Sequence, residues 1–374
     1  MRVLLLYKDY HPVVGGIENH IRLLARGLRN EGVDASVLVT NTGPATQRQA
    51  IDGVPVTKTS RQAHVLSTPI SLPFFVELRR QMATVDLVHI HAPYPLAELA
   101  QLMLGRAKPT VISYHSDIVR QKKTAKLYAP FLKKVLQRAA LVAASSPAYI
   151  ESSPFLQDVR QKCRVIHYGI ETERFEETEQ VRGDAESLRN QYGDLPLLLF
   201  IGRLRHYKGV DVLIRAMHDI RAQLLIIGTG PMQEVWQNLA QTESLTGKVF
   251  FLGDASESEA LAARYAADLF VLPSTNRAEA LGIVQLEAMA CGMPVVCTEL
   301  GTGTSYVNRD GGTGLVVPPN DPRALAVAIN RLLASPALRA KMGVEGRRRV
   351  RSEFSLQEMI NATISFYEEA LRKS

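Results

Sequence analysis

The feature that most constrains the fold is a strand–helix–strand pattern in the second half of the chain. Residues 269–272 form a short apolar run followed by a polar loop, as expected of a buried parallel strand. Apolar residues then recur with helical spacing over 283–290, and Gly292 and Pro294 end that pattern. A second apolar run follows Pro294. Helices that join parallel strands are the repeating units of α/β domains, which bind ligands at the carboxyl ends of their strands.

Two carboxylates, Glu279 and Glu287, lie eight positions apart in this pattern. We expect Glu279 in the loop after the strand and Glu287 one turn inside the helix. The helix N-terminus at 282–284 offers free N–H groups and a positive dipole end, which suit a diphosphate. Glu287 would then accept hydrogen bonds from ribose hydroxyls, and Glu279 from a sugar. The alternative is that Glu279 caps the helix and Glu287 lies on its solvated face, but an unpaired charge is costly in so apolar a helix.

A second loop with charged residues that could bind a ligand follows an apolar run at 197–201. It reads G-R-L-R-H-Y-K-G and places Arg203 and Lys208 between a strand and a helix. Two cations there could neutralise a diphosphate leaving group, although a pair of ordinary surface cations is the alternative. A third turn, G-T-G-P, begins at Gly228 after another predicted strand. The sequence therefore predicts phosphate-binding groups on several loops of one α/β domain.

These residues carry a resemblance to a known family. The segment E-A-L-G-I-V-Q-L-E-A-M-A-C-G-M-P-V-V at 279–296, together with G-R-L-R-H-Y-K-G, is similar to the signatures of family 4 retaining glycosyltransferases. Those enzymes use sugar-nucleotides, require no metal and have the GT-B fold, and the resemblance extends over nearly the whole chain. It implies that Arg203 and Lys208 bind the donor's β-phosphate. It also implies donor contacts at these positions: Gly15, Gly16, Gly202, Gly228, Gly230, Leu281, Gly282, Ile283, Val284 and Glu287.

The first half of the chain begins with an apolar run at 3–7, the loop H-P-V-V-G-G-I-E and a helical pattern over 17–29. Gly15 and Gly16 could bring backbone N–H groups toward an anion, or simply form a turn. The loop is not the G-x-G-x-x-G of dinucleotide-binding proteins. The resemblance places it against the donor's phosphates or the acceptor.

Three histidines end predicted strands in this half: His89, His91 and His115. A metal site is a poor interpretation because no carboxylate partner is evident. The alternative for His89 and His91 is that backbone atoms satisfy them. The resemblance implies a different role for His115, in S-Y-H-S-D, which would contact the donor sugar near its reacting carbon.

At 374 residues the chain exceeds one ordinary core, which predicts two domains. We expect an α/β, GT-B architecture of two Rossmann-like doubly wound domains that face a central cleft. The first would span 1–170, a linker with a helix 171–194, and the donor-binding domain 195–354. The last helix, 355–374, would cross back onto the first domain.

The net charge of +7 favours anionic partners, among which charge alone cannot choose. Residues 120–138 predict a helix with a basic and an apolar face, which is either a solvated surface or a peripheral contact with anionic lipid. Three cysteines in no metal spacing favour a reducing cytosol, and no apolar run is long enough to span a bilayer. We therefore expect a cytoplasmic protein, peripheral at the inner membrane face in the second case, with no nucleic-acid partner.

The resemblance implies retaining transfer of a hexose from a nucleotide-sugar to a saccharide or lipid-linked acceptor of a surface polysaccharide or glycolipid. GDP-mannose is the first expectation for the donor and a UDP-sugar the next. Arg203, Lys208, Glu279 and His115 would be the catalytic residues. No cofactor or metal is expected, since the nucleotide-sugar is a co-substrate. Two alternatives remain: a sugar-nucleotide epimerase or hydrolase of the same architecture, and a non-catalytic nucleotide-sugar-binding protein.

Overall fold

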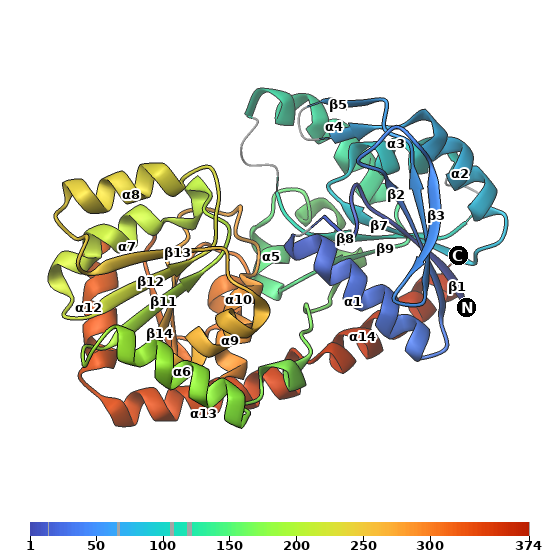
Figure 1. Ribbon diagram of the computed structural model, residues 1–374. Helices are drawn as coiled ribbons and strands as arrows, with labels where there is room; N and C mark the ends of the chain where they lie inside the picture. The colour runs from blue at the N-terminus through green and yellow to red at the C-terminus, as the bar shows by residue number, and fades with distance from the viewer. Residues whose placement is uncertain (14, 66–67, 105–107, 118–121, 374) are drawn as a thin grey trace. The chain divides into compact units, whose positions relative to one another are not determined.

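The computed structural model describes the chain except residues 14, 66–67, 105–107, 118–121 and 374. The chain forms two compact units. Unit 1 comprises Met1–Gly169 together with Leu356–Ser374, and unit 2 comprises Ile170–Ser355. Each unit is built around its own β-sheet (Figure 1).

Unit 1 holds an eight-stranded sheet in the order β10-β9-β8-β7-β1-β2-β4-β3. All neighbours are parallel except the edge strand β3, which runs antiparallel to β4. The strands are β1 (Arg2–Leu6), β2 (Asp34–Thr40), β3 (Gln47–Ile51), β4 (Val54–Thr59), β7 (Leu87–Ala92), β8 (Thr110–Tyr114), β9 (Leu141–Ala144) and β10 (Cys163–Val165). The central strand β1 is buried from Val3 onward, as its apolar sequence requires.

The helices of unit 1 include one from the far end of the chain. They are α1 (Gly16–Asn30), α2 (Leu72–Met82), α3 (Pro95–Leu104), α4 (Lys122–Arg138), α5 (Pro147–Ser152), the 3-10 helix η1 (Gln157–Lys162) and α14 (Leu356–Arg372). A hairpin of β5 (Ala63–Val65) and β6 (Thr68–Ile70) precedes α2. Helix α14 packs on α1, and Tyr367 on α14 hydrogen-bonds His89 on β7 at 2.7 Å. The prediction that the last helix returns to the first domain is confirmed.

Unit 2 holds a fully parallel six-stranded sheet in the order β13-β12-β11-β14-β15-β16. The strands are β11 (Leu197–Ile201), β12 (Gln223–Ile227), β13 (Val249–Gly253), β14 (Leu269–Leu272), β15 (Val295–Thr298) and β16 (Gly314–Val317). The α-helices are α6 (Glu179–Gln191), α7 (Val210–Ala216), α8 (Gln233–Thr242), α9 (Glu257–Ala266), α10 (Ile283–Ala290), α11 (Thr304–Val307), α12 (Pro322–Leu333) and α13 (Pro336–Glu353). Short 3-10 helices are η2 (Thr172–Phe175), η3 (His206–Lys208) and η4 (Met217–Asp219).

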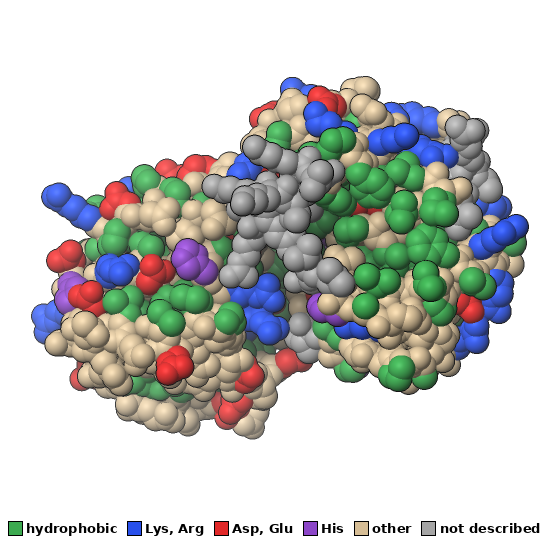
Figure 2. Space-filling view, turned by 90° about the horizontal axis from the view of Figure 1, so that it is seen from above, with side chains coloured by type: hydrophobic (Ala, Val, Ile, Leu, Met, Phe, Trp, Pro, Cys, Tyr) green, Lys and Arg blue, Asp and Glu red, His purple; other side chains and the backbone are tan. Residues whose placement is uncertain are grey.

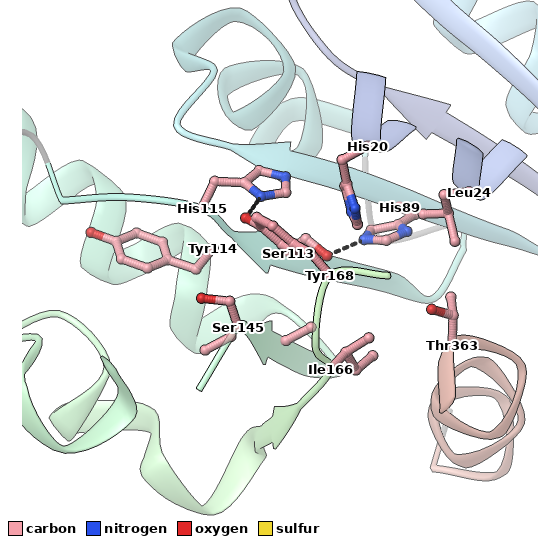
Figure 3. A pocket seen from close by; sticks show the side chains of 12 residues that line it. His20, Leu24, His89, Ser113, Tyr114, His115, Ser145, Ile166, Tyr168 and Thr363 are labelled. Atoms are coloured by element: carbon pink, nitrogen blue, oxygen red, sulfur yellow. Dashed lines mark hydrogen bonds between the residues drawn. The ribbon is translucent and has the colours of Figure 1, made fainter. Parts of the chain in front are cut away.

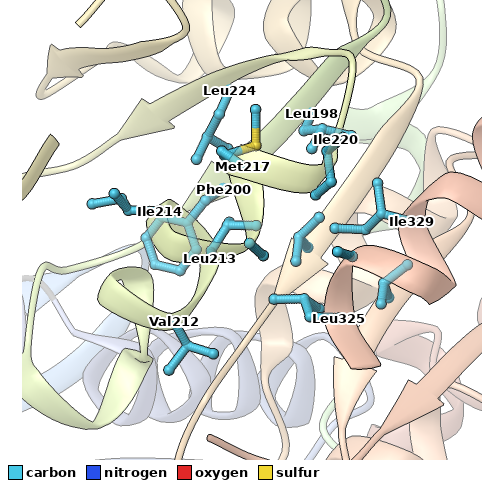
Figure 4. Packing of buried hydrophobic residues seen from close by; sticks show 14 of the residues in the cluster. Leu198, Phe200, Val212, Leu213, Ile214, Met217, Ile220, Leu224, Leu325 and Ile329 are labelled. Carbon is cyan, nitrogen blue, oxygen red and sulfur yellow. The ribbon is translucent and has the colours of Figure 1, made fainter. Parts of the chain in front are cut away.

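The core of unit 2 fixes the sheet that carries the loops described below. Leu198 and Phe200 on β11 and Leu213 on α7 are fully buried (Figure 4). Leu325 and Ile329 on α12 complete the same cluster. Complete burial of one such side chain contributes roughly 1.5–3 kcal/mol, so the strand ends are held by a substantial apolar layer.

Four short strands are absent from the sequence prediction. Strand β3 is polar and mostly exposed at the sheet edge, and so shows no apolar run. The hairpin strands β5 and β6 have three residues each. Strand β16 lies inside the segment 310–322, which its Gly and Pro content predicts to be turns. Such segments acquire strand geometry from their neighbours, and their own sequence does not signal it.

Candidate active site

The carboxyl ends of two strands in unit 2 bring their loops into backbone contact. Gly202 follows β11, and Gly228 and Gly230 follow β12. Gly228 has a φ of +124°, and a Cβ there would lie 2.3 Å from the Gly202 carbonyl oxygen. A Cβ on Gly230 would lie 2.5 Å from the Leu204 carbonyl oxygen. Only glycine allows these two loops to approach so closely.

Lys208 and Glu279 form a buried ion pair at this edge of the sheet. The Lys208 Nζ lies 2.5 Å from the Glu279 Oε2, and the two side chains are only 10% and 9% exposed. Ser274, which follows β14, donates its hydroxyl to the same oxygen at 2.9 Å. Burial acts to lower the pKa of Lys208, but Glu279 and Tyr207 outweigh it and raise that pKa above its ordinary value. The pair is therefore charged and fixed, which preorganises the ammonium beside the loop.

Arg203, the other predicted cation, lies in the same loop and has an exposed side chain. The loop is held by main-chain hydrogen bonds: Thr275 N donates to the Tyr207 carbonyl at 2.8 Å, and Leu204 N to the Thr229 carbonyl at 2.9 Å. A fixed loop with an exposed guanidinium and a buried ammonium offers an anion one cation at the surface and one that is held in place.

The N-terminus of α10 lies in the same chain segment as Glu279. Gly282 has a φ of +75°, and a Cβ there would lie 2.5 Å from the Leu272 Cδ2. Gln285 N makes the first-turn hydrogen bond to the Gly282 carbonyl at 2.9 Å, so the N–H groups of Ile283 and Val284 precede it. The Gln285 side chain donates to the carbonyl of the buried Leu281 at 2.6 Å and fixes this turn.

Glu287 is paired with a residue that sequence reasoning missed. Arg264, on α9, donates to the Glu287 Oε2, and its side chain is 5% exposed against 24% for Glu287. Arg264 also donates to the Ala260 carbonyl at 2.9 Å, and its guanidinium lies 5.6 Å from the ring centroid of Phe175. An arginine inside the alanine-rich pattern L-A-A-R-Y-A-A was the available signal, since a charge at such a position needs a partner.

The predicted histidines of unit 1 are hydrogen-bonded to side chains around them. His115 pairs through Nε2 with the His91 Nδ1 at 2.8 Å and through Nδ1 with the Tyr168 hydroxyl, and Figure 3 draws the second of these bonds. His89 pairs with the Ser113 hydroxyl at 2.8 Å, in addition to Tyr367. Side chains, and not the backbone atoms considered from the sequence, therefore satisfy His89.

A fourth histidine, His20 on α1, was not predicted; its ring packs against those of His91, His115 and Tyr168, so the four histidines form one cluster. It lies on the buried face of the helix, four positions before Leu24, and that spacing was the available signal. A cavity of about 10 Å³ beside it has room for one water molecule. Burial lowers the pKa of His20 to about 4 and of His89 to about 3, and it lowers the pKa values of His91 and His115 well below their usual range.

Ring nitrogens of His20, His91 and His115 lie within 4.8 Å of one another, a distance that metal ligands can share. The His91 and His115 nitrogens, however, are hydrogen-bonded directly at 2.8 Å. Two nitrogens at about 2.0–2.1 Å from a tetrahedral Zn²⁺ would lie farther apart than this. The His91 Nδ1 and the His115 Nε2 are therefore partners in a hydrogen bond and do not share a metal ion.

Gly15 and Gly16 lie at the N-terminus of α1 in unit 1. The carboxylate of Glu18 folds over this turn, since a Cβ on Gly15 would lie 2.1 Å from the Glu18 Oε2. An anion of the protein itself thus occupies the positive end of this helix dipole.

The basic segment 120–138 falls partly outside the described residues. Helix α4 begins at Lys122, and side chains are described from Tyr128 onward. Lys133 pairs with Asp158 at 2.7 Å, and Arg138 donates to the Leu102 carbonyl at 2.7 Å. Of the helices within the described ranges, none is long and apolar enough to cross a membrane.

Two α/β units, each built on a largely parallel sheet, are the architecture of the GT-B fold. In unit 2, cations, carboxylates and a helix N-terminus lie at the carboxyl ends of the strands, where such sheets bind ligands. Residues 14–174 match the family described as Glycosyltransferase Family 4, and residues 185–349 match Glycosyl transferases group 1. The chain belongs to glycosyltransferase family 4 and transfers a sugar from a nucleotide-sugar.

Known proteins similar to the chain over its full length support this assignment. The D-rhamnosyltransferase WbpZ of Pseudomonas aeruginosa is 36% identical over 95% of this chain and 92% of its own length. The O-antigen chain mannosyltransferase C of Escherichia coli is 33% identical over 98% of both chains. Among solved structures, a sucrose-phosphate synthase from Thermosynechococcus elongatus superposes with a TM-score of 0.82 at 26% identity, over 100% of both chains.

Proposed function

We propose that this enzyme transfers a mannose from GDP-mannose, with retention of configuration, to a saccharide or lipid-linked acceptor of a surface polysaccharide or glycolipid. The observation that carries the proposal is the buried pair of Lys208, in the loop after β11, with Glu279, in the segment that leads to the N-terminus of α10. The names of the two curated relatives, a mannosyltransferase and a D-rhamnosyltransferase of bacteria, support a mannose-type donor.

The site residues of unit 2 suit departure of a diphosphate from the sugar's anomeric carbon. Arg203, Lys208 and the N–H groups at 282–284 stabilise the negative charge that develops on the leaving oxygen. Glu279 orients the sugar hydroxyls through the carboxylate oxygen that Lys208 does not hold. Glu287 accepts hydrogen bonds from the ribose hydroxyls through the carboxylate oxygen that Arg264 does not contact. The buried side chain of Leu281 holds the turn before α10, and so positions the N–H groups at 282–284.

The bond changes balance without a covalent enzyme intermediate. The C–O bond to the diphosphate breaks, and the acceptor hydroxyl forms a new C–O bond on the same face of the sugar. Its proton passes to an oxygen of the departing diphosphate. In unit 1, His115 is proposed to position the sugar, and the turn at Gly15 and Gly16 to contact the donor or acceptor.

The proposed setting is the cytoplasm, at the inner face of the membrane where lipid-linked acceptors are available. Cys163, Cys291 and Cys297 are free thiols, which fits a reducing compartment. The basic helix α4 is proposed to face anionic lipid there.

The test is thermal stabilisation of the protein by GDP-, UDP-, dTDP- and ADP-sugars, followed by assay of nucleoside diphosphate release. We expect a shift with GDP-mannose and release of GDP when acceptor is present. A shift with UDP-sugars alone would overturn the donor assignment. Conversion of the donor into an isomeric nucleotide-sugar would indicate an epimerase, and binding without turnover on any acceptor tested would indicate a binding protein.

A further inference from the structure

Helix α2 of unit 1 exposes a stripe that changes from apolar to basic along its length. Leu72 is 70% exposed and Val76, one turn later, is 69% exposed. Arg79 and Arg80 continue the stripe at the helix C-terminus and are also exposed. These positions share one face because residues three or four apart are neighbours on a helix. An apolar pair this exposed contributes nothing to the core of unit 1 and lowers solubility.

Helix α3 and strand β6 extend the same apolar surface. On α3, Leu99 is 42% and Met103 is 66% exposed, again one turn apart. Ile70 on β6 is 39% exposed. Helix α3 contacts both β6 and α2, so these side chains belong to one neighbourhood. Figure 2 shows hydrophobic side chains gathered on the face of unit 1 that α2 and α3 contribute to, with Lys and Arg around them.

The concentration of these side chains is uneven over the protein. Among the residues that the structure describes, nine large hydrophobic side chains are exposed, and five of them are those on β6, α2 and α3. The others lie singly on elements of unit 2, at Val235, Leu252, Val327 and Val344. Single exposed apolar residues are ordinary, whereas a cluster rimmed by cations marks a binding surface.

The charges of this surface have one sign. The two helices contain two acidic residues, Glu77 and Glu98, and both are buried. Glu77 is paired with Arg48 and Arg80. Glu98 accepts hydrogen bonds from the Tyr128 hydroxyl and the Tyr94 N–H. Glu77 therefore offsets part of the charge of Arg48 and Arg80, and Arg79 adds a further exposed positive charge, so the three arginines together outweigh the one carboxylate that they surround.

We propose that the surface formed by Ile70, Leu72, Val76, Leu99 and Met103 docks unit 1 on an anionic lipid bilayer. The five apolar side chains enter the boundary between headgroups and acyl chains, and the arginines contact lipid phosphates. Pairing with a second copy of this chain through the same surface would oppose like charges, which disfavours a homodimer. The inference extends the proposed function, because it names the surface that would bring unit 1 to a lipid-linked acceptor.

The test is co-sedimentation of the full chain with vesicles of phosphatidylcholine and of phosphatidylcholine mixed with phosphatidylglycerol. We expect binding to the mixed vesicles only. The triple variant Leu72→Ser/Val76→Ser/Met103→Ser should bind at least ~100-fold more weakly, since each apolar side chain contributes roughly tenfold. Arg79→Gln should weaken binding ~5-fold and reduce its salt dependence. The matched control, Val327→Ser/Val344→Ser in unit 2, should bind like the wild type.

Three further measurements separate the outcomes. Circular dichroism and GDP-mannose turnover on a water-soluble acceptor should be unchanged in the triple variant, which excludes misfolding. A Lys208→Met variant that loses turnover but still binds vesicles would separate the membrane surface from the chemistry. Equal vesicle binding by the triple variant and the wild type would overturn the proposal. So would light scattering that shows a wild-type dimer converted to a monomer by the triple substitution, since the surface would then join two copies.

Discussion

The two cations of the loop after β11 differ in exposure, and this difference separates their effects on activity from their effects on stability. Arg203 is exposed, whereas Lys208 is buried against Glu279. Loss of an exposed charge changes the free energy of unfolding little. Loss of one partner of a buried pair leaves the other charge uncompensated and costs about 3–5 kcal/mol.

We therefore predict that Arg203→Ala and Lys208→Ala each lower kcat by roughly 10²–10³-fold, the size expected for one lost preorganised donor. Only Lys208→Ala should also lower the melting temperature. The double variant Lys208→Met/Glu279→Gln should recover the melting temperature but not kcat. Steady-state kinetics and calorimetry measure both quantities. Wild-type turnover in either single variant would remove that residue from the mechanism.

The Arg264–Glu287 pair gives a second prediction about single side chains. Glu287→Gln should weaken GDP binding, because the amide is a poorer acceptor for ribose hydroxyls than the carboxylate. It should also destabilise the protein, since Arg264 is then a buried charge without its carboxylate partner. Arg264→Met/Glu287→Gln should restore the melting temperature while GDP binding stays weak. Isothermal titration that finds wild-type affinity in both variants would refute the ribose contact.

Four of the site residues could be recognised in the sequence, whereas the partner of Glu287 could not. Glu279, Glu287, Arg203 and Lys208 occur in short windows with recognisable spacing, so their presence and their loops follow from the sequence. That Arg264 holds Glu287 does not follow. The pairing depends on how α9 packs beside α10, and no local pattern encodes that packing.

Among the secondary-structure elements, the buried strands were the easiest to predict and the edge strands the hardest. The expected strands at 197–201 and 269–272 and the expected helix at 283–290 coincide with β11, β14 and α10. Their apolar runs determine both their geometry and their burial. Strand β3 is exposed and polar, so only its pairing with β4 makes it a strand.

The histidine cluster links strands β7 and β8 with α1 and α14, and it makes this group of elements sensitive to acid. The pKa of His20 is lowered from 6.5 to about 4 by burial, and that of His89 from 6.5 to about 3. The unfolded chain therefore binds protons below pH 6.5 that the folded state does not bind. The free energy of unfolding should be constant above this pH and fall as the pH drops from 6.5 toward 4.

We predict a slope of up to about 1.4 kcal/mol per pH unit for each of these histidines between pH 6.5 and 4. The variant His20→Leu should lose one such contribution, so its unfolding free energy should fall less steeply with acid. Urea denaturation at a series of pH values gives the slopes. Equal slopes in the wild type and His20→Leu would show that His20 is protonated in the folded state.

For the chain as a whole, unit 1 is discontinuous and unit 2 is continuous. Helix α14 supplies Tyr367 to His89 on β7, and Glu369 to Arg164 on β10. It also buries Met359, Ile360 and Phe366. Unit 1 therefore depends on residues that follow the whole of unit 2, and unit 2 depends on none from outside its own range for its sheet.

We predict that deletion of residues 356–374 destabilises unit 1 selectively. Calorimetry should resolve two unfolding transitions. GDP should raise the transition temperature of unit 2, and the deletion should lower only the transition temperature of unit 1. The contribution of three buried apolar side chains, roughly 1.5–3 kcal/mol each, makes the shift large. A single transition that shifts as one body in the truncated protein would show that the two units unfold together.

Because α14 returns to unit 1, the unit whose synthesis begins first is the one whose folding can finish only last. During translation the first 169 residues emerge early, but their final helix is made only after the whole of unit 2. Unit 2, encoded without interruption, can complete its sheet before then. Until α14 has been made, the surface of unit 1 on which this helix packs stays exposed to solvent. Stalled or prematurely terminated chains would therefore carry a finished donor-binding unit attached to an unfinished one, which is the form that chaperones and proteases would recognise.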